Sequence, residues 1–97
     1  MKTKYIVKRI RQMENIMDEV IYAFKNSESF WENKRMKENV KTLTHYMDSG
    51  IWRSDYEKCE RGELPKKLKC GVLSEDTLYN LICDIEQAER DIKNNGI

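Results

Sequence analysis

The chain has 97 residues, the length of one small domain with a modest core. Charged residues make up 36% of the sequence, but the formal net charge at pH 7 is only +1, so no strong overall attraction to nucleic acid or to a membrane surface is expected. The sequence contains neither an apolar run long enough to cross a membrane nor a signal-peptide core, and we therefore expect a cytoplasmic protein.

The first predicted helix covers about residues 3–25, where apolar residues recur at steps of four and three. This stripe consists of Ile6, Ile10, Met13, Met17, Val20 and Phe24, and it is widened by Val7, Ile16 and Ile21. Nine apolar positions exceed the needs of a single helix–helix seam. The stripe therefore predicts several packing neighbours, or a dimer.

A second helix is predicted over about residues 30–48, because Ser29 and Glu32 have the spacing of a capping box. Its apolar face carries Met36, Val40, Leu43 and Met47. Asn26 and Ser27 are expected to form the turn between the first two helices, and so short a connection makes them antiparallel.

The motif stretch, residues 52–81, holds the only proline and the clearest start of a helix. Trp52 and Tyr56 are four residues apart and share one face of a short helix predicted over about residues 51–60. Gly62 has the position of a glycine that ends a helix.

An ordered loop over residues 62–73 is expected to follow, since Pro65 imposes extended backbone on the residue before it. Gly71 is predicted to supply a turn, and Ser74 to cap a last helix over about residues 75–94. Acidic residues in the first turn would favour that helix through its dipole, and these are Glu75 and Asp76. The predicted fold is all-α and a single domain over residues 1–97, a small bundle of three longer helices closed by one short helix and the ordered loop.

The motif stretch and the residues just before it also resemble a known family. The pattern consists of Tyr46, Trp52, Asp55, Tyr56, Glu57, Gly62, Leu64, Pro65, Leu68, Lys69, Gly71, Val72, Leu73, Ser74, Glu75, Asp76, Tyr79 and Leu81. It is similar to a small bacterial family catalogued as domain of unknown function 4298, and the similarity covers nearly the whole chain. The resemblance implies an all-α fold and a bacterial source, but no activity. Cys70 stands where the family pattern has an arginine.

Asp55 has two interpretations. As part of a structural clasp, its carboxylate would accept backbone N–H groups of the loop or pair with Lys69, because an ordered loop needs partners for its backbone. The alternative is an enzyme or metal site built around Asp55 and residues 62–73. We favour the clasp, with Trp52 mostly buried against the loop leucines and Tyr56 partly so.

No catalytic, cofactor or metal site is predicted elsewhere. His45 is the single histidine and is expected to be an exposed residue without an orienting partner. The three cysteines, Cys59, Cys70 and Cys83, lack the paired spacing of a disulfide framework or a zinc site. We therefore predict three free thiols, no bound metal and no cofactor.

Charge is distributed unevenly along the chain. Residues 1–11 contain five basic side chains and no acid, whereas residues 75–91 contain six acids and Arg90. The basic run has the composition of a nucleic-acid footprint. We favour instead a solvated helix end that faces the acidic last helix, because the net charge is close to zero.

Three functions remain open from the sequence. The first is a small non-enzymatic protein that acts through protein contacts, with a homodimer as one form. The second is a nucleic-acid-associated regulator that uses the basic N-terminal helix. The third is the enzyme or metal site around Asp55. The first is favoured because no catalytic signature is present and the stripe on the first helix is broad.

Overall fold

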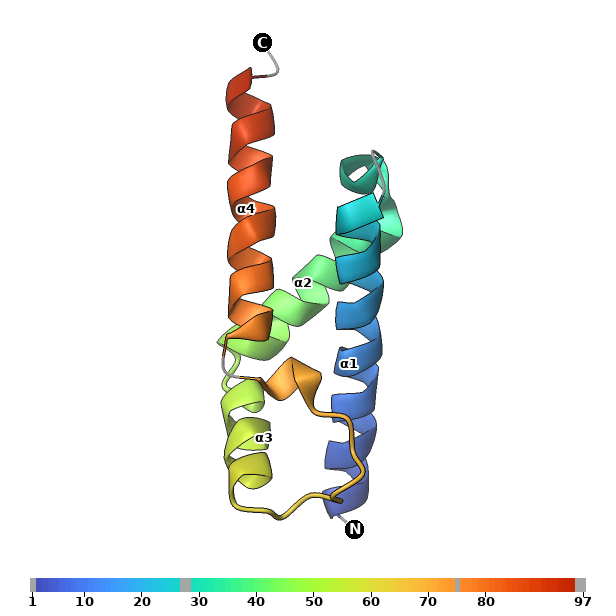
Figure 1. The fold of residues 1–97 in the computed structure, drawn as a ribbon, viewed down its shortest axis with the longest axis vertical. Coiled ribbons are helices and arrows are strands. Elements are labelled where there is room, and N and C mark those ends of the chain that lie inside the picture. The colour runs from blue at the N-terminus through green and yellow to red at the C-terminus, as the bar shows by residue number, and fades with distance from the viewer. Residues whose placement is uncertain (1, 27–28, 75, 96–97) are drawn as a thin grey trace.

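The computed structural model describes residues 2–26, 29–74 and 76–95. Within these residues the chain is all-α, as predicted, with four α-helices, two 3₁₀ turns and no strand (Figure 1). The α-helices are α1 at Lys2–Asn26, α2 at Lys34–Asp48, α3 at Ile51–Glu60 and α4 at Thr77–Asn95. The 3₁₀ turns are η1 at Phe30–Glu32 and η2 at Gly71–Leu73.

The molecule is elongated and measures 51 × 19 × 18 Å along its principal axes. α1 forms one long column, while α3 and α4 lie one above the other along its side, and α2 crosses diagonally between them (Figure 1). The three longer helices therefore do not run side by side along their whole length. α3 lies beside the first half of α1, while α4 begins beside the second half and extends beyond the end of α1 (Figure 1).

η2 lies where the helices meet, and it contacts α1, α3 and α4. The side chains with less than 2% exposure include Ile10, Val20, Leu43, Val72 and Leu78. Because Val72 belongs to the end of the predicted loop, this segment is part of the core. The loop is therefore ordered by burial of its own apolar residues.

The flanks of the α1 stripe are used within the monomer. Ile16 and Ile21 are partly buried against the core, since α1 contacts α2, η2 and α4. The width of the stripe is thus explained without a dimer. Self-association stays a prediction that needs another surface.

The predicted break after α1 is confirmed, but the predicted start of the second helix is wrong. α1 ends at Asn26, and Ser27 lies outside the described residues. Phe30–Glu32 form η1, and α2 begins only at Lys34, where the side chain of Asn33 accepts a hydrogen bond from the Met36 backbone N–H at 3.2 Å. The aromatic rings in this turn account for the delay, because Phe30 and Trp31 pack edge-on against Phe24 in α1.

α3 has the predicted bounds. Gly62 adopts φ +71°, and its N–H donates to the Cys59 carbonyl at 3.1 Å while the Glu63 N–H donates to the Lys58 carbonyl at 3.0 Å. These two bonds form a Schellman motif, which explains why a glycine ends this helix.

α4 begins two residues later than predicted. The Asp76 carbonyl accepts from the Asn80 N–H at 2.8 Å, so Asp76 has the N-cap position that we predicted for Ser74. Ser74 has extended backbone and follows η2. Glu75 lies outside the described residues.

Candidate functional site

Asp55 is the centre of the motif stretch, and its side chain has no exposure to solvent. Arg9 of α1 donates from Nε to Oδ2 at 2.9 Å and from Nη2 to Oδ1 at 2.5 Å. The Tyr46 hydroxyl of α2 donates to Oδ2 at 2.6 Å. A two-bond arginine–carboxylate pair is among the stronger charged contacts in proteins. Asp55 therefore ties α3 to both α1 and α2.

This arrangement corrects the predicted partner of Asp55, which was the loop backbone or Lys69. Lys69 instead donates to Asp18 at 3.0 Å, and the loop backbone is bound by Glu14. Asp55 is buried and does not line an open cleft, but its side chain joins α3 to α1 and α2 and does not contact the loop.

The hydrogen bond to Asp55 helps to keep the Tyr46 phenol in its neutral form. Burial, followed by its hydrogen bond to Asp55, raises the pKa of the Tyr46 phenol well above the ordinary value for tyrosine. The hydrogen bond with Asp55 also raises the pKa of Arg9. The protonated phenol and the charged guanidinium are thus the forms that the fold stabilises.

We expect this tyrosine to make the fold sensitive to alkali. As the pH rises above about 10, the unfolded chain releases the Tyr46 proton while the folded chain retains it. The stability linked to the phenol is therefore complete below about pH 10 and falls by about 1.4 kcal/mol per pH unit above it. Urea unfolding of the wild type and of Tyr46→Phe between about pH 9 and 11 measures the difference. Parallel losses in the two proteins would contradict the assignment.

Glu14 of α1 has the role that was predicted for Asp55, although no motif in the sequence pointed to this residue. Its side chain is 4% exposed, and Oε1 accepts the Val72 backbone N–H at 2.8 Å. The Lys69 ammonium lies 3.8 Å from Oε2. A Cβ on Gly71 would lie 2.9 Å from the same oxygen, so the absence of a side chain permits this close approach. The only sequence signal was an acid on the flank of an apolar stripe.

Replacing Glu14 by alanine should lower the free energy of unfolding by about 1.5–3 kcal/mol, because the buried Val72 N–H loses a charged acceptor. Asp18→Ala is the matched control, since it removes an acid one turn further along α1 whose pair with Lys69 is exposed. The control should change stability by less than about 0.5 kcal/mol. Equal urea midpoints for the two variants would show that Glu14 does not anchor the loop.

Trp52 binds the backbone carbonyl of Val72, whose N–H is bound by Glu14. Its indole Nε1–H donates to the Val72 carbonyl at 2.8 Å, and its ring stacks on Tyr56 with centroids 5.1 Å apart. The side chain is partly buried and packs against the core. Glu14 and Trp52 together hold Val72 from α1 and α3, which is how a loop with little secondary structure keeps one conformation.

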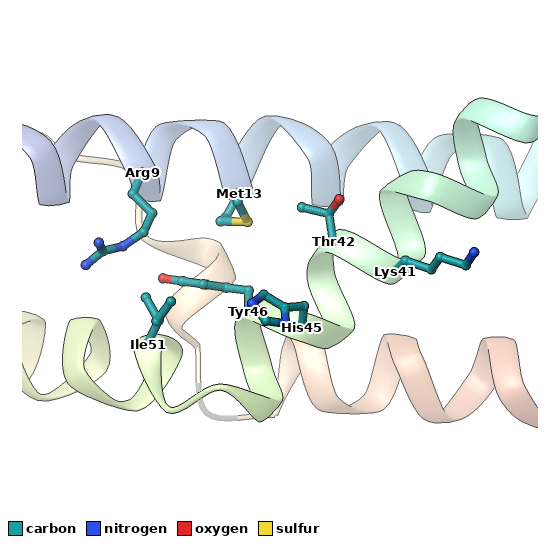
Figure 2. Close-up of a pocket in the computed structure, with 7 residues that line it drawn as sticks. All are labelled: Arg9, Met13, Lys41, Thr42, His45, Tyr46 and Ile51. Atoms are coloured by element: carbon teal, nitrogen blue, oxygen red, sulfur yellow. The ribbon is translucent and has the colours of Figure 1, made fainter.

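A shallow hollow of about 310 Å³ lies beside Arg9 (Figure 2). Its lining consists of Arg9, Met13, Lys41, Thr42, His45, Tyr46 and Ile51. Asp55 is not part of this lining, and the side chain of Lys41 extends away from Arg9 (Figure 2). His45 is exposed at this place.

The three cysteines are free and partly buried. Burial, and then a hydrogen bond with Cys59, raise the pKa of the Cys70 thiol to about 11. Over the described ranges, no group of three or more histidine, cysteine, aspartate or glutamate residues could hold a metal ion. The absence of a disulfide and of a metal stays a prediction, which thiol titration in denaturant and elemental analysis can check.

The remaining motif residues are not brought together with Asp55. Leu68 and Leu73 are buried in the core and Leu64 is partly buried, whereas Pro65 lies at the surface. Glu57 is exposed on α3 and pairs with arginines of the same segment. A further set of exposed motif residues consists of Ser74, Asp76 and Tyr79. The motif therefore divides into buried residues in the core and exposed residues, and of the exposed ones Ser74, Asp76 and Tyr79 lie around the start of α4.

α4 is bordered by three shallow hollows of about 240, 310 and 250 Å³. The apolar residues that line them are Ile85 with Phe30, Trp31 and Val40, then Leu78 and Tyr79 with Met47 and Trp52, then Leu81 with Ile21 and Phe24. Two of the large apolar side chains exposed in the described segments also belong to α4, Tyr79 at 59% and Ile92 at 49%. α4 thus presents apolar surface along much of its length.

None of the helices described here is both long enough and apolar enough to span a membrane. A family model with the description "domain of unknown function (DUF4298)" matches residues 10–93. This match confirms the resemblance seen in the motif residues. It includes Glu14, Tyr46 and Asp55 but begins at Ile10, the residue directly after Arg9. No curated protein and no solved structure matches the chain.

Proposed function

The chain belongs to the DUF4298 family, and we propose that it is a small, non-enzymatic cytoplasmic protein that acts through contacts with other polypeptides, a second copy included. One observation carries this proposal: α4 is surrounded by apolar hollows and exposes Tyr79 and Ile92. Exposed apolar surface of this kind is typical of protein interaction sites.

The exposed apolar side chains of α4 and the apolar hollows beside them suit an amphipathic helix as the partner. Such a helix would bury its own apolar stripe against Tyr79 while its polar face stays in water. α4 of a second copy offers the exposed side chains Tyr79 and Ile92 for such a contact, whereas its Leu78 and Ile85 are buried within the monomer. Self-association is therefore the form of contact that is tested first.

The test compares two pairs of exposed side chains. In Tyr79→Ser with Ile92→Ser the exposed apolar side chains of α4 are removed, while in Tyr5→Ser with Tyr22→Ser two still more exposed rings are removed from α1. We expect sedimentation of the wild type and of the α1 control to show association at micromolar concentration. The α4 variant should sediment as an 11.6 kDa monomer.

Partners other than a second copy are tested by a photoreactive phenylalanine analogue at Tyr79, with Tyr5 as the control position. Crosslinks formed only from position 79 are expected. Two results together would contradict the proposal. The wild type would stay monomeric, and the variants with the analogue at position 79 or position 5 would form either no crosslinks or equal crosslinks.

A further inference from the structure

Three basic residues lie on one exposed stripe of α1. Lys4, Lys8 and Arg11 follow each other at steps of four and three, so they share the helix face that points to solvent. The stripe extends about 10 Å, given about 1.5 Å of rise per residue. The apolar face of the same helix is buried in the core through Ile6 and Ile10.

The fold adds a second basic segment to this stripe. The chain from α3 returns alongside the first half of α1 before it reaches η2 (Figure 1). Lys67 and Lys69 consequently line one hollow of about 250 Å³ together with Arg11, Glu14, Asn15 and Leu68. Lys66, the neighbour of Lys67, is exposed as well. Basic residues separated by more than fifty positions in the sequence thus form one surface.

Few acids neutralise this surface. Glu14 is buried and accepts the Val72 N–H, and Asp18 is paired with Lys69. Across residues 2–26, 29–74 and 76–95, the cations that form no salt bridge include Lys4, Lys8, Arg11, Lys66 and Lys67. A net charge of +1 for the whole chain therefore conceals a basic face formed by α1 and the returning loop.

The acidic last helix does not face this end, and the sequence-based interpretation was wrong on that point. α4 meets α1 around Ile21, Phe24 and Lys25, in the half of α1 away from Lys4 (Figure 1). The position beside the first half of α1 is filled by α3, whose Asp55 binds Arg9. The separation leaves the basic stripe open to an external anion.

We propose that Lys4, Lys8, Arg11, Lys66 and Lys67 form a binding face for the sugar–phosphate backbone of nucleic acid. A row of lysine and arginine side chains binds phosphates at successive nucleotides without reading the bases. An anionic membrane is a poorer fit, because a membrane-surface helix inserts its apolar face, and the apolar face of α1 is enclosed in the core. This inference is independent of the α4 contact surface.

The test measures the anisotropy of a fluorescein-labelled 20-base-pair DNA duplex at several salt concentrations. About four phosphate contacts predict that log K falls with log salt with a slope of about −3 to −4. Changing Lys4, Lys8 and Arg11 together to glutamine should weaken binding at least about tenfold in 50 mM salt and reduce the slope by about 1 for each lost contact.

The matched control changes Lys25, Lys34 and Lys37 to glutamine, which removes the same charge from exposed positions elsewhere. It should bind within about twofold of the wild type if position and not total charge matters. Equal weakening in both variants, or no binding of the duplex at 100 µM protein in 50 mM salt, overturns the proposal. Binding to phosphatidylglycerol vesicles without binding to the duplex overturns it in favour of a membrane.

Discussion

Replacing Asp55 by alanine is expected to lower the free energy of unfolding by about 3 kcal/mol. Removal of one partner from a buried ion pair typically costs about 3–5 kcal/mol, because the other charge is left without compensation. The lower value applies here, since the Arg9 side chain is 34% exposed and keeps some contact with water. For a domain of this size the loss corresponds to a fall of roughly 12–24 °C in the melting temperature.

Glu57→Ala provides the control on the same helix. Glu57 is exposed, and its pairs with Arg53 and Arg61 are solvent-accessible, so stability should change by less than about 0.5 kcal/mol. Asp55→Asn should also destabilise, because its amide nitrogen would meet the donors of Arg9 and Tyr46. If Asp55 instead belonged to a ligand site, Asp55→Asn would leave the melting temperature unchanged or raise it.

Trp52→Ala is the second large effect, with an expected loss of about 3 kcal/mol. This value is at the lower end of the range for truncating a buried aromatic side chain, because the ring is only partly buried. The loss combines the stack on Tyr56 with the hydrogen bond that holds the Val72 carbonyl. A domain with a total stability of about 5–15 kcal/mol would be strongly weakened.

Trp52→Phe separates the two contributions. It keeps a ring against Tyr56 but removes the indole N–H, so a loss of about 1 kcal/mol is expected from the hydrogen bond, with a smaller one from the reduced ring. Urea unfolding followed by circular dichroism measures both variants. Losses below about 0.5 kcal/mol in both would mean that Trp52 does not hold the loop.

The helices could be predicted from the sequence because the spacing of apolar residues is local information. α3 was predicted with its correct bounds, since Gly62 is the single residue nearby that supports the Schellman motif. The caps were harder to predict, because two suitable residues stood a few positions apart in each case. Asn33 and Asp76 have the cap positions that were predicted for Ser29 and Ser74.

The partners in the candidate site could not be predicted in the same way. Arg9 and Asp55 are 46 positions apart, and Glu14 and Val72 are 58 apart, so no local pattern connects them. We predicted that Asp55 would accept backbone N–H groups of the loop. Glu14 is the acceptor instead, because α1 contacts η2. The same long-range geometry separates the basic N-terminal segment from the acidic α4.

The most direct test of the contact that holds α3 against α1 is a double-mutant cycle between Arg9 and Asp55. The single variants Arg9→Met and Asp55→Ala and the double variant are unfolded in urea, and the coupling free energy is obtained by difference. A coupling of about 2–3 kcal/mol is expected, because removing both partners leaves no unpaired charge behind. Additive effects within about 0.5 kcal/mol would show that this ion pair does not hold α3 against α1.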